Sequence, residues 1–172
     1  MTCDSAADPH ARLIQLLDDQ RASYRIIDHP PEGRTEIVSS MRGHPVSQAA
    51  KCLVVMVKFG KKVTKFILAV VPGDRRVDLA AIRSLKNATY AGFAPPERAE
   101  LLCGSVMGTV LPFAFDDRLE LIADIGLKDL AELFFNAARL DRSIALSTDD
   151  YVRLARPRFE RIADRPQPAA GR

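Results

Sequence analysis

The chain has 172 residues, the length of one domain with room for a sizeable core. Hydrophobic residues make up 47% and charged residues 27%, which is the composition of a globular protein and excludes disorder throughout. The formal charge of +3 is too small to indicate a face for long duplex nucleic acid, and the scarcity of aromatic residues argues against a stacking sheet for single strands.

The first predicted element is an amphipathic helix that begins at Pro9. Asp8 is a favourable N-cap, and a proline in the first helical position loses no hydrogen bond. Three leucines at helical spacing then form one apolar stripe: Leu13, Leu16 and Leu17.

Three short elements are predicted before the main strands. Residues 24–27 have the pattern of a strand, which the sequence His29-Pro30-Pro31 ends. A helix is predicted from Thr35 to about Met41, ending at Gly43, and residues 46–50 form a further turn.

The strongest β signal is a pair of near-continuous apolar runs. Residues 52–57 and 66–71 are separated by the polar segment 58–62, which predicts a hairpin buried on both faces. A turn at 72–74 follows, and Asp78 can cap a helix from Leu79 to about Lys86.

The second half is predicted to hold short elements around the glycine-spaced loop 104–113. In order they are a strand at 89–92, a helix from Pro95 to Leu102, a strand at 119–123, a helical turn at 127–130, strands at 133–136 and 143–146, a helix at 148–155 with Ser147 and Asp150 as a capping pair, and a short helix from Pro157 to Asp164. Strands and helices alternate irregularly, so we expect one α/β domain around a mixed sheet over residues 9–164, with a flexible N-terminus (1–8) and a disordered tail (165–172).

Cysteines, histidines and the chain ends bear on metal binding and compartment. The three cysteines show no CxxC spacing and the three histidines no HxxxH pair, so neither a zinc site nor a disulfide framework is predicted. No apolar run approaches the roughly 18 residues of a membrane span, and the first residues lack a signal-peptide core. We therefore expect a cytoplasmic protein without a membrane partner.

Basic residues are unevenly distributed. Six arginines crowd the last twenty residues: Arg153, Arg156, Arg158, Arg161, Arg165 and Arg172. A solvated helix end with a basic tail is the simpler interpretation, and a handhold on a nucleic-acid backbone is the alternative.

Five segments carry a resemblance when they are taken in order. They are His29-Pro30 with Arg34-Thr35-Glu36; Gln48 to Val55, in which Lys51 enters a strand; Ala69 to Asp78; the GxxxP loop Gly108 to Pro112 with Phe113; and Asp124 with Phe135-Asn136-Ala137 and the strand from Ser143. In this order they resemble the YbaK/ProX family of aminoacyl-tRNA deacylases, free-standing relatives of the editing domain of bacterial prolyl-tRNA synthetases. The resemblance covers roughly residues 10 to 164.

The resemblance implies a fold, a reaction and partners. The fold would be a mixed, mostly antiparallel, barrel-like sheet surrounded by helices. The reaction would be hydrolysis of the ester that joins a noncognate amino acid to the 3′ adenosine of tRNA, without a metal or dissociable cofactor. The expected partner is the acceptor end of mischarged tRNA, here tRNA for proline carrying alanine, cysteine or serine, with prolyl-tRNA synthetase as a further candidate.

The resemblance also implies the site residues. Catalytic positions are Lys51 and the loop residues Gly108, Thr109 and Pro112; substrate-binding positions are His29, Cys52, Val110, Phe113, Asp124 and Asn136. Without the family context, Lys51 is an ordinary lysine at a strand edge; within it, Lys51 is a cation that holds the substrate. The loop could supply backbone N–H groups to an oxyanion, or it could be a tight connection only.

No side chain is a convincing proton-transfer base. Histidine is a common general base, but His29 precedes two prolines and has no acidic neighbour in sequence, which favours a structural or pocket-wall role. The apolar surroundings of Cys52 and Cys103 should raise their pKa values and make them poor nucleophiles. Asp124 could position the loop or cap a helix. We therefore expect catalysis assisted by the substrate, through the ribose 2′-OH or a group of the amino acid.

Two departures from the family pattern keep an alternative function open. Cys52 stands where relatives often have a small polar residue, and Ala138 where many have glycine after Asn-Ala. Both bear on the shape of the pocket. The alternative to the hydrolase is a non-catalytic module that binds aminoacyl-tRNA or a nucleotide-like ligand.

Overall fold

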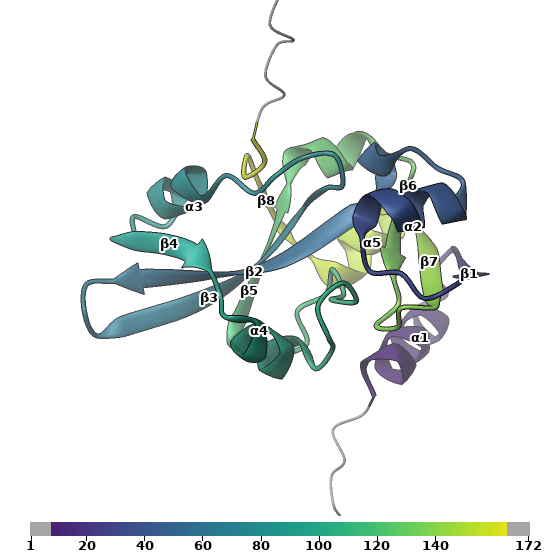
Figure 1. The fold of residues 1–172 in the computed structure, drawn as a ribbon, viewed down its shortest axis with the longest axis horizontal. Coiled ribbons are helices and arrows are strands. Elements are labelled where there is room, and N and C mark those ends of the chain that lie inside the picture. Colours follow the sequence, from purple (N-terminus) through teal and green to yellow (C-terminus); the bar gives the residue numbers. More distant parts are fainter. Residues whose placement is uncertain (1–7, 165–172) are drawn as a thin grey trace, which may run out of the picture.

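The computed structural model describes residues 8–164 (Figure 1). The predicted flexible N-terminus and disordered tail fall in 1–7 and 165–172, outside the described residues, except for Asp8. Asp8 is the N-cap of the first helix and accepts a hydrogen bond from the N–H of Ala11, as its position before Pro9 predicts.

The strands form two sheets. The larger has the order β4 (Tyr90–Phe93), β2 (Ala50–Phe59), β3 (Val63–Pro72), β5 (Leu119–Asp124) and β8 (Arg158–Glu160), and the smaller has the order β1 (Tyr24–Asp28), β7 (Arg142–Ser147) and β6 (Glu132–Asn136). Only the β3–β5 and β5–β8 pairs are parallel, so the expected mixed, mostly antiparallel arrangement is confirmed. The expected barrel-like form is wrong in detail. The larger sheet stays open because its outer strands, β4 and β8, are short and do not pair with each other.

Within residues 8–164 five helices surround the sheets; the first begins at its predicted residue, and the other four begin and end close to their predicted bounds. They are α1 (Pro9–Asp19), α2 (Thr35–Arg42), α3 (Leu79–Leu85), α4 (Pro96–Cys103) and α5 (Thr148–Ala155), with 3-10 turns at Val46–Gln48 and Ile125–Asp129. The caps act as predicted: Asp78 and Ser147 accept N–H groups at the starts of α3 and α5, and Gly43 ends α2 with a φ of 77°. None of the helices within residues 8–164 is long and apolar enough to cross a membrane.

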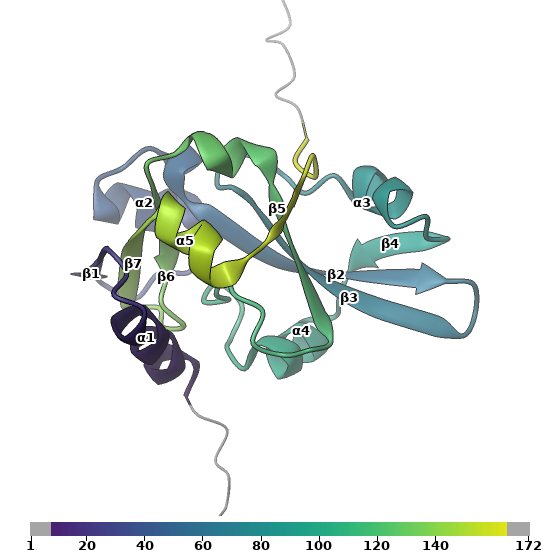
Figure 2. The same ribbon diagram turned by 180° about the vertical axis from the view of Figure 1, so that it is seen from behind.

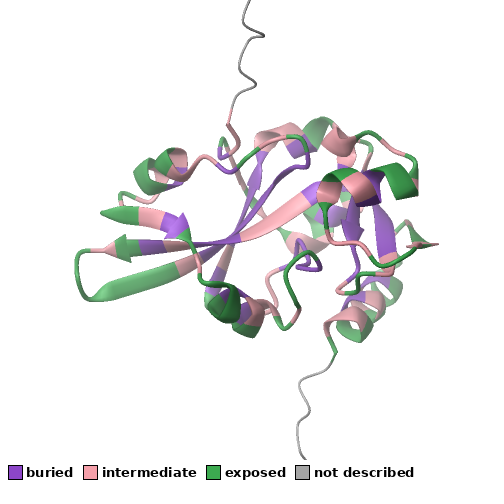
Figure 3. Ribbon diagram, in the orientation of Figure 1, coloured by how far each residue is buried: buried purple, intermediate pink, exposed green. Residues whose placement is uncertain are grey.

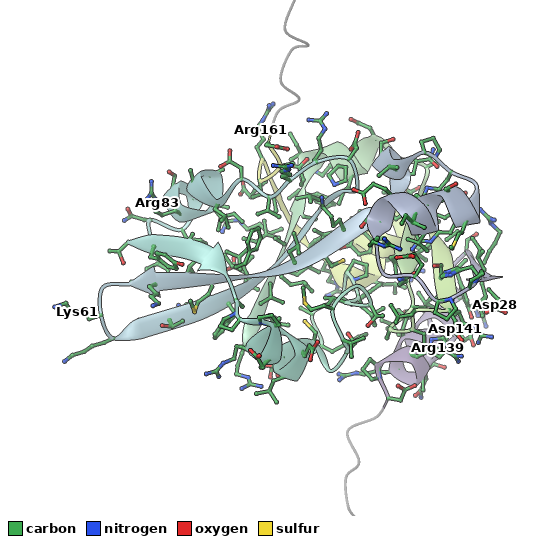
Figure 4. The ribbon with its side chains drawn as sticks, in the orientation of Figure 1. Asp28, Lys61, Arg83, Arg139, Asp141 and Arg161 are labelled. Carbon is green, nitrogen blue, oxygen red and sulfur yellow. The ribbon has the colours of Figure 1, made fainter. Side chains whose placement is uncertain are left out.

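The β2–β3 hairpin separates two hydrophobic cores, as its two apolar runs predict. Val54 and Val70 face the larger core, which contains α1, α4 and α5, while Val55 and Ile67 face a smaller core closed by α3. Figure 3 shows the buried residues concentrated where the two sheets meet, and the tip of the hairpin exposed. Lys61 at that tip and Arg83 on α3 point outward (Figure 4).

The segment after Pro157 differs from the prediction. The expected short helix to Asp164 is wrong, because residues 158–160 form β8, which pairs in parallel with the end of β5 (Figure 2). Asp124 holds the chain beyond β8: its carboxylate accepts the N–H groups of Ile162 and Ala163, both at 2.9 Å. The open edge of β5 supplies hydrogen bonds that no pattern local to residues 157–164 reveals.

One edge of β2 is left open over a short stretch. β4 pairs with β2 only from Val55 onward, and Ala49, just before β2, bridges to Phe134 of β6. Between these two points, no strand of the described chain covers this edge. In a strand, the backbone N–H and C=O groups of every second residue point to the same edge. The C=O of Val54 accepts the N–H of Ala94 at 2.9 Å, so Val54 points to the edge on the β4 side. The backbone of Cys52, two residues earlier, therefore points to the open part of that edge.

Ala138 occupies a backbone conformation that favours glycine. It lies in the connection between β6 and β7 with a φ of 61°, which costs a residue with a Cβ about 1–2 kcal/mol. We expect Ala138→Gly to raise the free energy of unfolding by about 0.5–1 kcal/mol, since the greater chain entropy of glycine offsets part of the relief. Urea denaturation measures the change. Ala137→Gly, at a buried neighbour without positive φ, should destabilise instead; equal signs for the two variants would contradict the prediction.

Candidate active site

A cavity of about 190 Å³ lies at the open edge of β2. Its walls come from the segment before α2, from α2 itself, from the start of β2, from the loop after α4 and from β6. The lining residues are Gly33, Thr35, Val38, Arg42, Ala49 to Leu53, Met107, Gly108, Val110 and Phe134 to Asn136. Four segments distant in sequence thus meet where β2 has no neighbouring strand.

The structure brings together half of the residues that the resemblance implied. Those that line the cavity are Lys51, Cys52, Gly108, Val110 and Asn136. The other five lie outside its wall: His29, Thr109, Pro112, Phe113 and Asp124. The candidate site therefore consists of the first group, and the second group has no direct place in the cavity wall.

The residues outside the wall have structural contacts of their own. Thr109 is buried and its hydroxyl donates to the C=O of Val106 at 2.7 Å. Phe113 lies in the larger core, where its ring packs edge-on against Tyr151. Asp124 caps the 3-10 turn that begins at Ile125, which agrees with the capping alternative, and it lines a separate polar cavity; its other hydrogen bonds go to Ile162 and Ala163 rather than to the loop 108–112.

Lys51 is half-buried at the mouth of the cavity. It forms no ion pair with a carboxylate within residues 8–164. Burial lowers its pKa below the ordinary value of 10.5, and the more distant carboxylates of Glu36 and Asp164 partly offset that effect. The result is an ammonium group with hydrogen-bonding capacity left for an anionic or polar ligand.

The side-chain amide of Asn136 connects the walls of the cavity. Its Nδ2 donates to the C=O of Glu32 and to the C=O of Gly108, each at 2.9 Å. Its Oδ1 accepts from Ser143 at 2.9 Å and from Arg42 at 3.0 Å. One buried amide thus links β6 to β7, to α2 and to the two loops at the mouth.

Arg42 is a functional candidate that the sequence analysis did not identify. It lines the cavity from the last turn of α2, and burial lowers its pKa to about 10. It donates to Ser143 and Asn136, contacts His44 at 3.5 Å and forms no ion pair within the described chain. An arginine in the last turn of a helix ordinarily complements the helix dipole, so its position alone gave no signal.

The two glycines at the mouth approach each other closely. Gly108 has a φ of 87°, and a Cβ on it would lie 3.0 Å from the Cα of Gly33. The N–H of Thr109 is bonded within the loop to Val106, whereas no acceptor for the N–H groups of Gly108 and Val110 is found in the described chain. These two amides are the groups that an oxyanion hole would use.

No group in the cavity wall is suited to remove a proton near neutral pH. The titratable lining residues are Lys51, Arg42 and Cys52. Burial raises the pKa of Cys52 above its ordinary range and that of Cys103 to about 11, as the sequence predicts. His29 is held by the Pro30 C=O at 2.9 Å and by Ser143 Oγ at 2.6 Å.

Comparison with known proteins decides the family. A family model described as the aminoacyl-tRNA editing domain matches residues 29–154, well over half of the chain. The chain belongs to this family. The multifunctional Ser/Thr-tRNA deacylase ProXp-y of Escherichia coli (strain K12) is 39% identical over 149 residues, which cover 86% of this chain and 89% of the relative.

Two further matches agree with this editing domain assignment. A proline–tRNA ligase of Bacillus licheniformis is 28% identical over 145 residues, covering 81% of this chain and 24% of the ligase. The crystal structure of a candidate trans-editing enzyme for prolyl tRNA synthetase has a TM-score of 0.75 at 20% identity, over 94% of this chain and 100% of that one, which shows a shared fold. The family resemblance is confirmed, and with it the expectation of an aminoacyl-tRNA deacylase, a hydrolase of the ester bond.

The arginines near the end of the editing domain lie away from the cavity wall. Arg153 pairs with Asp150 at 2.9 Å and Arg158 with Glu160 at 2.9 Å. Arg161 points outward near the last described residues (Figure 4). Arg165 and Arg172 lie outside the described residues. These pairs fit the simpler interpretation of a solvated surface.

The contact between the two glycines generates a test of the loop. We expect Gly108→Ala to lower deacylation about tenfold or more, because the added methyl group displaces Gly33 and the free amides of the loop. Gly60→Ala is the matched control, since Gly60 has a φ of 68° but nothing within 4 Å of an added Cβ. Initial rates on mischarged tRNA compare the two. Equal rates for both variants would exclude a role for the close approach of the loops.

Proposed function

We propose that this chain removes serine or threonine from mischarged tRNA, with Lys51 holding the substrate and the cavity at the β2 edge accepting the amino acid. The observation that carries the proposal is the half-buried Lys51, which has no carboxylate partner among residues 8–164 and lines a cavity of about 190 Å³. The choice of amino acid is supported by the 39% identical Ser/Thr-tRNA deacylase.

The cavity has the size and polarity for a small hydroxylated side chain. Its volume of about 190 Å³ is ample for the side chain of serine or threonine, and Val38 and Phe134 supply apolar walls beside the polar groups of Arg42 and Asn136. A guanidinium carries five N–H donors, and the contacts of Arg42 with Ser143, Asn136 and His44 use three of them. The remaining donors suit the hydroxyl of serine or threonine, and a site built to bond a hydroxyl discriminates against an analogue that lacks it.

The hydrolytic step follows from what the wall lacks. With no general base among its titratable residues, the water is oriented by the substrate, through the ribose 2′-OH or the α-amino group. The N–H groups of Gly108 and Val110 stabilise the oxyanion that forms when water adds to the ester carbonyl. Lys51 stays protonated and acts as a cation that fixes the 3′ end.

The tRNA and the site of action are also proposed. The match to a proline–tRNA ligase supports tRNA for proline as a substrate and the synthetase as the protein that releases it. Such an enzyme acts in the cytoplasm, where tRNA is charged.

A panel of charged tRNAs tests the function. Wild-type protein should deacylate seryl- and threonyl-tRNA much faster than alanyl- and phenylalanyl-tRNA, because only the hydroxylated side chains can accept from the unused N–H groups of Arg42. Lys51→Ala should be slower by about a hundredfold, the size expected for losing one electrostatic contact to the reacting ester. Lys58→Ala, an exposed lysine on the same strand, should match wild type.

The outcomes of this panel separate the candidate functions. If the protein removes no amino acid from any charged tRNA, the deacylase function is excluded. Binding of charged tRNA without hydrolysis would then favour the non-catalytic module. Full activity of Lys51→Ala would exclude the assigned site but not the reaction. A 2′-deoxyadenosine terminus cleaved at the normal rate would exclude assistance by the 2′-OH.

Binding should depend on pH through Lys51. The pKa of this lysine lies below 10.5, so the positive form is complete at neutral pH and is lost as pH rises through that lowered pKa. Affinity for an unreactive analogue, with serine joined to 3′-amino-adenosine by an amide, should fall in that range. Lys51→Arg should keep its affinity at the same alkaline pH because a guanidinium stays charged. Identical pH profiles for both proteins would contradict a cationic role.

A further inference from the structure

A second, larger groove of about 570 Å³ adjoins the first cavity. Lys51, Leu53 and Met107 line both spaces, so the two adjoin each other at these residues. The far wall of the groove comes from Phe93 at the end of β4, Pro96 at the start of α4 and Arg76. The site described above uses only the shared wall of this groove.

The register of the strands places Phe93 opposite Val55, on the same face of the sheet as Lys51 and four residues along β2 from it. Val55 pairs with Phe93, and Lys51, Leu53 and Val55 alternate onto the same face of β2. The ring of Phe93 is 52% exposed and packs against no other aromatic ring in residues 8–164. An exposed aromatic face therefore stands at the end of an apolar groove whose other end is the candidate catalytic lysine.

We propose that this groove binds the adenine base of the 3′-terminal nucleotide, stacked on Phe93, while the amino acid occupies the first cavity. The proposal rests on the proposed function, because the ester joins the amino acid directly to the ribose of that adenosine. If Lys51 binds the 3′ end next to the ribose, the adenine attached to that ribose must occupy a space that Lys51 also lines. Among the large cavities of the described chain, this groove is the apolar space that does so.

The walls match the chemistry of a terminal nucleotide. A volume of about 570 Å³ falls in the range typical of small-ligand sites, roughly 300–1,000 Å³. Stacking on an aromatic ring needs no hydrogen-bond partner, and the groove is otherwise lined by apolar residues. Arg76 is exposed, forms no ion pair within the described chain and can meet the phosphate that precedes the adenosine.

The other polar cavity does not suit this ligand. It shares no lining residue with the first cavity, so a base in it would be detached from the ester. Its wall includes four carboxylate residues, Asp74, Asp124, Asp129 and Asp164, which outnumber the two arginines there, Arg75 and Arg161, so the wall is less favourable to a phosphate than that of the groove.

The test compares an ester that carries the base with one that lacks it. Wild type should hydrolyse 3′-O-seryl-adenosine with a higher kcat/KM than serine ethyl ester. Phe93→Ala should lose about tenfold on the adenosyl ester and nothing on the ethyl ester, while Phe93→Trp, which keeps a stacking face, should retain the difference. Tyr90→Ala is the matched control, because Tyr90 is equally exposed on β4 but lies over Lys58, away from the groove.

Binding of the amide analogue makes the result independent of turnover. Its dissociation constant should rise about tenfold in Phe93→Ala and stay unchanged in Tyr90→Ala. Unchanged affinity and unchanged hydrolysis in Phe93→Ala, with wild type active on charged tRNA, would overturn the adenine site and leave the deacylase intact. Wild type inactive on every charged tRNA would overturn the proposed function, and the binding measurement would still decide the groove.

Discussion

The amide of Asn136 is the constraint on which the site depends. Both of its N–H donors and its carbonyl oxygen are used, and the partners come from three parts of the chain: Glu32 and Arg42, Gly108, and Ser143. A buried amide left with an unmet donor costs about 1–3 kcal/mol, so the loop at Gly108 and the segment at Glu32 are held where Asn136 requires them. The mouth of the cavity is therefore fixed by the buried side chain of Asn136 at the end of β6, and not by contacts within the loops alone.

The open edge of β2 follows from the same arrangement. β6, which carries Asn136, meets the start of this strand at Ala49, and β4 meets it again from Val55. Between these two points β2 pairs with β3 on one side, and no strand of residues 8–164 covers its other edge. Because Lys51 and Cys52 lie side by side on a strand, their side chains point to opposite faces, and the lysine reaches both the small cavity and the larger groove. The start of β2 thus lines the small cavity, and two of its residues, Lys51 and Leu53, also line the larger groove.

Sequence patterns predicted the elements well and the site only in part. Capping residues and apolar spacing located the five helices, because these signals act within one turn of chain. β8 was missed because its pairing depends on β5, nearly 40 residues earlier. Likewise, Phe113 and Asp124 belong to motifs of the resemblance but pack elsewhere, whereas Arg42 enters the wall with no motif of its own. Which side chains line a cavity depends on tertiary contacts such as those of Asn136, and these have no period in the sequence.

The electrostatics of the wall determine what kind of catalyst this can be. Burial disfavours charge on both Lys51 and Arg42, yet each pKa starts so high that both groups remain cations at neutral pH. Burial acts in the opposite direction on Cys52, whose thiol stays protonated and neutral. The wall therefore offers positive charge and hydrogen-bond donors but no acceptor for a proton. This distribution of charge fits the proposed mechanism, in which the wall stabilises negative charge on the ester and the substrate activates the water.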